Sequence, residues 1–151
     1  MRSRKRHLVL ATVLTLLGAF LLYTWILASC KKSSRLKRDA EDEVRMLRAG
    51  LTILFCWKCD DPKFAELIGK PIEPKMLKDL LLTPREVILV PSFEFRCVRS
   101  EGFIDPWGSG YRGLVRKEGD LLRCSVWSAG PNGRDEDMKG DDIADEWLGR
   151  P

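Results

Sequence analysis

The sequence predicts an α+β protein in which an N-terminal transmembrane helix continues into an amphipathic helix packed on a small antiparallel sheet. Residues 8–29 form an uncharged apolar run, residues 33–58 repeat apolar side chains at helical spacing, and the C-terminal half alternates like strands. A chain of 151 residues has room for one small domain beside such an anchor. We therefore divide it into a basic N-terminus (residues 1–7), a membrane anchor (residues 8–29) and a soluble domain (residues 30–151).

The charge distribution argues against a nucleic-acid partner. The chain holds 26 Lys and Arg against 22 Asp and Glu, and four of the bases, Arg2, Arg4, Lys5 and Arg6, precede the apolar run. Residues 31–151 therefore carry as many acids as bases. A nucleic-acid-binding domain shows a clustered basic surplus instead.

The uncharged run is long enough to cross a membrane. A helix rises ~1.5 Å per residue, so about 20 residues cover a hydrocarbon core of ~30 Å, and this run has 22 residues. Tyr23 and Trp25 lie near its far end, where aromatic rings prefer the headgroup region. A cleavable signal has an apolar stretch of only ~7–15 residues. The sequence thus favours a single-pass membrane protein with membrane lipid as a partner.

A lipid anchor is the alternative. Residues 27–30, Leu-Ala-Ser-Cys, look like the cleavage box of bacterial lipoproteins, in which Cys30 would be lipidated. The length of the run favours the retained anchor over this reading. Charge does not set the orientation, since four bases precede the run and five follow it at Lys31, Lys32, Arg35, Lys37 and Arg38.

The elements after the anchor follow from periodicity and turn residues. A stripe of Leu36, Ala40, Val44, Leu47, Leu51 and Leu54 predicts the amphipathic helix, which Pro62 ends. Short helices are expected at residues 63–68 and 75–82, and strands at residues 86–90 and 93–98. Residues 111–116 and 121–127 predict a hairpin around the turn 117–120. The remainder from Asn132 is interpreted as an acidic tail.

Two strings carry a family resemblance. Residues 105–112, DPWGSGYR, resemble the D-P-W-G-x-P-Y-x-Y segment of type II secretion major pseudopilins. Residues 128–133, SAGPNG, followed by DDI at residues 141–143, resemble the S-x-G-x-D-G … D-D/A-D-I tail of the same family. The resemblance implies a pilin-like domain on an N-terminal helix, acting outside the cytoplasm at the bacterial inner membrane with other envelope or secretion-system proteins as partners.

The chain departs from that family at defined positions. The G-F-T-L-x-E-like junction cut by a prepilin peptidase is absent, and the apolar run contains no acid. Gly110 stands where the family's first motif has proline, and Gly113 where it has the last tyrosine. Asn132 replaces the aspartate of the second motif.

The acidic tail is a candidate calcium site. Asn132, Asp135, Asp137, Asp141 and Asp142 offer side-chain oxygens among several glycines, and calcium takes 6–8 oxygen ligands in flexible geometry. The spacing is not that of an EF-hand, and a solvated acidic tail is the competing interpretation. The pseudopilin resemblance implies calcium binding in this loop, with Asn132 and one of Asp141 or Asp142 as the matching side-chain ligands.

The five cysteines are Cys30, Cys56, Cys59, Cys97 and Cys124. With Cys30 at the membrane, the other four are an even number that suits disulfides outside the cytoplasm. Cys97 and Cys124 lie on predicted strands and are candidates for pairing. Cys56 and Cys59 form a C-x-x-C at a helix end, where no helix N-terminus lowers a thiol pKa. A structural disulfide or two partly buried thiols is therefore favoured over a redox or metal site.

The sequence predicts no catalysis. The single histidine, His7, precedes the apolar run, so the soluble domain has no histidine-based triad. We expect a membrane-anchored structural protein resembling a pseudopilin. The alternatives are an envelope lipoprotein with a binding or scaffold domain, and a thiol oxidoreductase built on Cys56 and Cys59.

Overall fold

The computed structural model describes the backbone of residues 2–58, 60–82 and 97–151, and the side chains of these residues from Leu17 onward. The chain divides into two compact units, Met1–Arg35 and Leu36–Pro151. The helix α1 (Arg2–Trp57) belongs to both units. The predicted α+β class is confirmed, since the second unit combines this helix with a small antiparallel sheet.

The first unit consists of the N-terminal part of α1. Its described large apolar side chains are exposed, between 42% at Leu27 and 68% at Trp25. Across the described residues, no helix combines the length and the apolar character that a membrane crossing requires. The side chains of residues 8–16, the first part of the predicted anchor, lie outside the described set.

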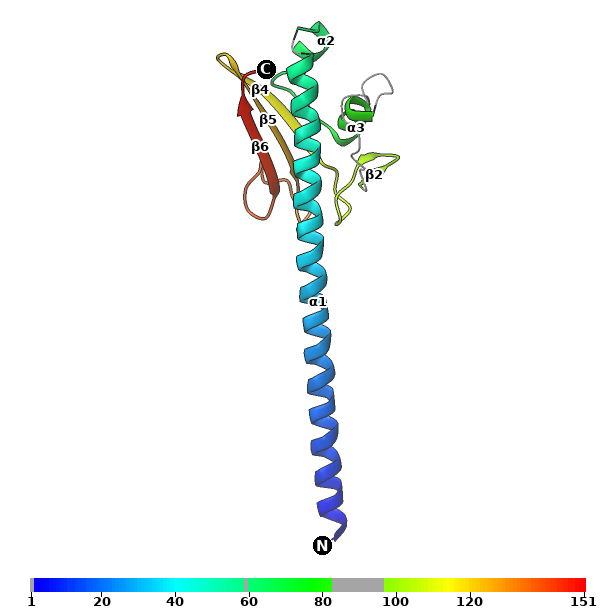
Figure 1. Cartoon of the computed structure of the whole chain (residues 1–151). Coiled ribbons are helices and arrows are strands. Elements are labelled where there is room, and N and C mark those ends of the chain that lie inside the picture. The colour runs from blue at the N-terminus through cyan, green and yellow to red at the C-terminus, as the bar shows by residue number, and fades with distance from the viewer. Residues whose placement is uncertain (1, 59, 83–96) are drawn as a thin grey trace. The chain divides into compact units, whose positions relative to one another are not determined.

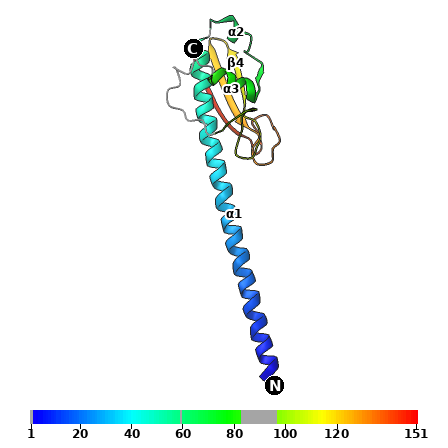
Figure 2. The same ribbon diagram turned by 90° about the vertical axis from the view of Figure 1, so that its right-hand side faces the viewer.

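The second unit packs α1 onto the sheet through the predicted apolar stripe (Figure 1, Figure 2). Ala40, Val44, Leu47 and Leu51 are fully buried and Leu54 nearly so, which confirms the 3.6-residue periodicity as the signal for this face. The helix ends at Trp57. Asp61 then caps α2 (Pro62–Ala65), its side chain accepting a 3.0 Å hydrogen bond from the Lys63 N–H.

A third helix, α3 (Pro74–Leu82), closes the core from another side. It buries Leu77 and Leu81, and it confirms the helix predicted for residues 75–82. Gly50 of α1 lies against it, since a Cβ at this position would be 3.2 Å from the Leu81 side chain. Glycine therefore lets the two helices approach closely.

The main sheet has the strand order β1-β4-β5-β6 and is antiparallel throughout. Its strands are β1 (Pro71–Ile72), β4 (Arg112–Glu118), β5 (Leu121–Ser128) and β6 (Ile143–Gly149). The hairpin β4–β5 confirms the prediction, and Cys124 pairs with Val115 on one side and Trp147 on the other. Two further short strands, β2 (Val98–Arg99) and β3 (Gly102–Phe103), form a separate ribbon.

The predictions for residues 86–98 and for the acidic tail have different outcomes. The strand predicted at residues 86–90, and all but the end of that at 93–98, lie outside the described residues. The acidic tail was predicted without secondary structure, whereas its end forms β6 along β5. Glu146 explains how an acid-rich strand is tolerated there, because it faces Arg123 at 3.2 Å and accepts a 2.9 Å hydrogen bond from Ser125.

Candidate functional site

The two family-like strings meet at one buried carboxylate. Asp105 is only 5% exposed, and its Oδ1 accepts hydrogen bonds from the Trp107 N–H at 3.0 Å and the Ser109 N–H at 2.8 Å. Its Oδ2 accepts from the Ser128 hydroxyl, whose oxygen accepts in turn from the Gly130 N–H at 3.0 Å. Because a buried carboxylate needs such partners, this network joins the turn 105–109 to the loop that follows β5.

That loop, residues 129–142, folds back on itself through several left-handed residues. Gly130, Gly133 and Gly140 have φ between 62° and 66°, and Asp137 and Met138 also have positive φ. At Gly130 a side chain would collide with the Asp141 carbonyl. Glycine is therefore required where the two ends of the loop touch. The acidic segment is a compact loop rather than an extended tail.

Three carboxylates of the loop converge. Glu136, Asp141 and Asp142 place oxygen atoms within 4.8 Å of one another. Asp142 Oδ2 accepts 3.0 Å hydrogen bonds from the Glu136 and Met138 N–H groups, whereas its Oδ1 is buried and has no partner among the described residues. An orphaned buried oxygen beside two further carboxylates is a donor set that suits a hard cation such as calcium.

The five predicted calcium ligands occupy different positions in this loop. Asp141 and Asp142 lie in the cluster. Asn132 is tied to it indirectly, because its backbone N–H donates to Asp141 Oδ2 at 3.1 Å and its side-chain amide donates to the same carboxylate. The Asn132 oxygen accepts from the Arg134 N–H at 2.6 Å. The exposed Asp137 donates its N–H to Asp135 at 3.1 Å.

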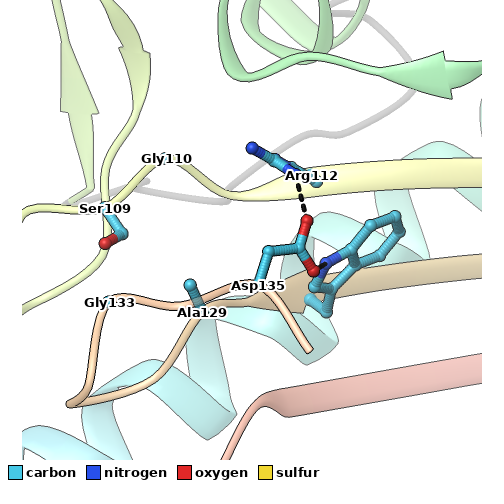
Figure 3. Close-up of a pocket in the computed structure, with 7 residues that line it drawn as sticks. Ser109, Gly110, Arg112, Ala129, Gly133 and Asp135 are labelled. Carbon is cyan, nitrogen blue, oxygen red and sulfur yellow. Dashed lines mark hydrogen bonds and ion pairs between the residues drawn. The ribbon is translucent and has the colours of Figure 1, made fainter. Parts of the chain in front are cut away.

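Asp135 lies outside the cluster and lines a neighbouring pocket (Figure 3). Its carboxylate pairs with the Arg112 guanidinium and accepts a 3.0 Å hydrogen bond from Trp127 Nε1. The pocket of about 200 Å³ is lined by Ser109, Gly110, Arg112, Trp127, Ala129, Gly133 and Asp135. The charges of Arg112 and Asp135 neutralise each other. The contacts of Asp135 with Arg112 of β4 and Trp127 of β5 hold the loop against these two strands.

Glu136 is the cluster residue that sequence reasoning missed. The spacing Glu136–Asp141–Asp142 matches no known metal motif, and a glutamate in an acidic run is unremarkable by itself. The structural signal is Gly140, where a side chain would overlap the Glu136 carboxylate. A glycine placed opposite a glutamate across a tight turn identifies the pair only once the loop is folded.

A groove of about 330 Å³ runs beside the cluster, between α1 and the start of β6. Asp142 belongs to its lining, which also includes Lys37, Glu41, Arg45, Ile143, Ala144 and Asp145. Just beyond, Arg48 bonds Asp145 at 2.9 Å, an ion pair whose side chains are 23% and 30% exposed. The start of β6 is therefore fastened electrostatically to α1.

The thiols occupy different environments. Cys97 and Cys124 are buried and free in the structure, so the pairing considered for them is not formed there, and Cys30 is exposed. Burial raises the pKa of the Cys97 thiol to about 12 and that of Cys124 to about 11. Cys56 lies in the last turn of α1, and Cys59 lies outside the described residues.

A comparison of the chain with protein families, curated proteins and solved structures finds no match.

Proposed function

We propose that this chain is a membrane-anchored, pilin-like structural protein that takes part in a type II secretion or pilus-like envelope assembly. The supporting observation is the junction of the two pseudopilin-like strings, where Asp105 of the first bonds Ser128 of the second. That junction lies in a domain whose sheet packs on the C-terminal half of one long helix. Sequence resemblance and spatial proximity thus coincide in the same residues.

The anchor is residues 8–29. Its support is the absence of any charge over 22 residues, together with the exposed apolar side chains of residues 17–27. Side chains such as Phe20 and Leu22, 63% and 59% exposed, gain free energy when they leave water for lipid. The domain 30–151 would then lie on the extracytoplasmic side of the bacterial inner membrane.

The protein acts by packing and partner contacts, without catalysis. Two of its carboxylates have structural partners: the partly buried Glu43 accepts a hydrogen bond from Tyr111, and the buried Asp105 accepts three, from Trp107, Ser109 and Ser128. Neither carboxylate faces either of the described pockets. Envelope or secretion-system proteins and membrane lipid are the partners, and nucleic acid is not among them.

Calcium is the proposed cofactor of the loop 129–142. Glu136, Asp141 and Asp142 would hold the ion, with the orphaned Asp142 Oδ1 as the oxygen that lacks any other partner. A bound divalent cation would offset the repulsion among the three carboxylates and fix the loop against Asp105 and Ser128. Asn132 would act through Asp141, by orienting its carboxylate.

The test combines fractionation with assembly. Full-length protein should stay in the membrane pellet after alkaline extraction, and protease added from the extracytoplasmic side should cleave residues 30–151. Deletion of the gene should block secretion or pilus assembly, and the full chain should restore it. Recovery of the full chain in the soluble fraction, or protection of the domain from outside, would overturn the proposal.

A second candidate, an envelope lipoprotein with a binding or scaffold domain, is favoured by the exposed thiol of Cys30. Mass spectrometry of the purified N-terminus separates the two candidates. A diacylated Cys30 at the new N-terminus identifies the lipoprotein, and an intact residue 1–30 segment identifies the spanning anchor.

A further inference from the structure

We propose that Asn132 is a site of spontaneous deamidation, at which the folded loop 129–142 converts asparagine to aspartate and isoaspartate. Asn132 is followed by Gly133, and both residues are exposed. The chain contains no glutamine and no other asparagine, so Asn132 carries its single side-chain amide. Asparagine is among the chemically labile residues of proteins. This modification is independent of the proposed secretion role and of a bound cation.

The reaction needs only the chain and water. The backbone nitrogen of Gly133 loses its proton to hydroxide and attacks the side-chain carbonyl carbon of Asn132. The bond from that carbon to the amide nitrogen breaks, and the nitrogen takes up a proton from water and leaves as ammonia. The product is a five-membered imide that joins residues 132 and 133. Water then adds to either imide carbonyl and breaks one C–N bond, which leaves aspartate or isoaspartate at position 132.

The side-chain carbonyl of Asn132 is held by a donor suited to the charge that develops on its oxygen. This oxygen accepts a 2.6 Å hydrogen bond from the Arg134 N–H, which closes a turn between the side chain and the backbone two residues on. The oxygen becomes negatively charged when the Gly133 nitrogen attacks. A backbone N–H in this position stabilises such an oxyanion. The turn therefore favours the first step of the reaction.

The amide nitrogen of Asn132 is oriented as well. It donates to the Asp141 carboxylate, whose other oxygen accepts a 3.1 Å hydrogen bond from the Asn132 backbone N–H. Hydrogen bonds to an amide lie near its plane, whereas a nucleophile approaches the carbonyl carbon from above or below that plane. The contacts with Arg134 and Asp141 therefore fix the amide without covering the faces that can be attacked.

Glycine leaves the attacking nitrogen accessible. Gly133 has a φ of 66°, which glycine adopts without strain. Its N–H donates to the Gly130 carbonyl at 3.2 Å, at the long end of the range for such bonds, so little is lost when the proton leaves. Among the described residues outside its chain neighbours, the atom nearest to a Cβ at Gly133 would be Ser109 Oγ, at 3.7 Å (Figure 3). Hydroxide and water therefore reach this exposed peptide from solvent.

The product changes the charge of the loop. A carboxylate at position 132 has no N–H to donate, so the side-chain bond to Asp141 is lost and two carboxylates face each other instead. Neighbouring like charges disfavour each other's ionised form. The modified loop should therefore be less stable wherever both carboxylates are ionised.

The test follows the mass of the full-length protein, kept folded in detergent at pH 8. Trypsin releases the peptide 124–134, in which Asn132 is the only residue with a side-chain amide. Exchange of the NH₂ group for OH adds about 1 Da, or about 3 Da in water enriched in oxygen-18. We expect this gain in the folded protein at a rate at least equal to that in a synthetic peptide of residues 128–136, with both aspartate and isoaspartate among the products.

Asn132→Gln is the matched control, because its amide lies one methylene further from the backbone and would have to close a six-membered ring. This variant should gain no mass over the same period. An unchanged folded protein beside a modified synthetic peptide would overturn the proposal. Equal mass gain in wild type and Asn132→Gln, or aspartate without isoaspartate, would exclude the imide route.

The variant Asn132→Asp tests the consequence for the loop. It should unfold at a lower denaturant concentration than unmodified wild type when both are measured in chelator at pH 7. An equal or higher unfolding midpoint would contradict the loss of the contact with Asp141.

Discussion

The hydroxyl of Tyr111 donates a 2.6 Å hydrogen bond to Oε2 of Glu43, which connects the end of the turn 105–110 to α1. Tyr111 is fully buried, and Glu43 is partly buried on the helix. Burial, reinforced by the Glu43 carboxylate, raises the pKa of Tyr111 far above its usual range. With the Glu43 carboxylate ionised, the phenol is therefore the donor, and this partly buried polar bond fixes the helix to the domain.

Removal of that donor should destabilise the protein. Tyr111→Phe leaves the Glu43 carboxylate partly buried without its partner, and such a loss costs about 1–3 kcal/mol. The measurement is chemical denaturation of the full-length protein in detergent at pH 7. Tyr23→Phe is the matched control, because Tyr23 is 60% exposed in the first unit and should shift stability by less than about 0.5 kcal/mol. Equal effects of the two changes would contradict this role of Tyr111.

The same carboxylate predicts a pH dependence. Burial raises the pKa of Glu43 above 4.5, an effect that the Tyr111 hydrogen bond only partly opposes. The folded state thus binds a proton more tightly than the unfolded state, and the contribution of Glu43 to stability falls as pH rises from 4.5 through the raised pKa. Glu43→Gln, which cannot ionise, should gain stability relative to wild type over this window.

The control for that titration is Glu101, whose pKa in the folded protein is shifted in the opposite direction. The Ser100 hydroxyl lowers the pKa of the exposed Glu101, so its contribution is present above 4.5 and is lost as pH falls. The free energy of unfolding of Glu101→Gln should therefore fall relative to that of wild type as pH rises. Unfolding curves of the three proteins between pH 4 and pH 7 provide the comparison. A Glu43→Gln difference that does not vary with pH would rule out a raised pKa in the folded protein.

The Asp105 network predicts a graded pair of variants. Asp105→Ala leaves the Trp107 and Ser109 N–H groups and the Ser128 hydroxyl without their acceptor, and should cost about 3 kcal/mol or more. Asp105→Asn keeps one acceptor oxygen for the two N–H groups and should cost clearly less. Asp120→Ala, in the exposed β4–β5 turn, is the control. Thermal unfolding of the full-length proteins would contradict the network if alanine and asparagine behaved alike.

The thiols predict an ordered labelling pattern. Cys97 and Cys124 are buried with pKa values raised to about 12 and about 11, so at pH 8 they should resist a maleimide that modifies the exposed Cys30. Both should react after unfolding without reductant. Mass spectrometry of the adducts checks this. A Cys97–Cys124 disulfide would leave both unlabelled in the unfolded protein, and a lipidated Cys30 would leave that residue unlabelled in the folded one.

Local patterns predicted the helices and the hairpin, because their signals lie within a few turns of chain. The stripe Ala40–Val44–Leu47–Leu51 needs only helical spacing, and residues 112–128 need only alternation around a turn. The strand β6 alternates between half-buried and exposed residues, but only Ile143 is buried, and the strand carries the acids Asp145 and Glu146. Its pairing depends on Arg123 and Arg48, which are distant in sequence.

The site was predictable only in part for the same reason. Asp141 and Asp142 were identified from their place in a motif, and they lie together. The separation of Asp135 from the cluster depends on Arg112 and Trp127, which come from two other strands. Neither that competition nor the bond between Glu43 and Tyr111 leaves a periodic trace in the sequence.

Calcium should stabilise the protein through the loop 129–142. Only the folded loop brings Glu136, Asp141 and Asp142 together, so the ion would bind the native state and raise the unfolding midpoint. The gain should reach about 2.7 kcal/mol at a hundredfold excess over the dissociation constant. Magnesium should do much less, because it is smaller and demands octahedral geometry. Thermal unfolding of the full-length protein in chelator, calcium and magnesium measures the difference.

Isosteric variants separate the ligand role from the fold of the loop. Asp142→Asn keeps an oxygen for the Glu136 and Met138 N–H groups but removes charge from the orphaned position. Together with Glu136→Gln it should abolish the calcium shift and leave the midpoint in chelator nearly unchanged, because the carboxylates repel one another when no cation is bound. Asp60→Ala with Asp120→Ala removes two exposed acids elsewhere and should keep the full shift. An unchanged wild-type midpoint in millimolar calcium would exclude the site, and the cluster would then serve only to cap the backbone of its own loop.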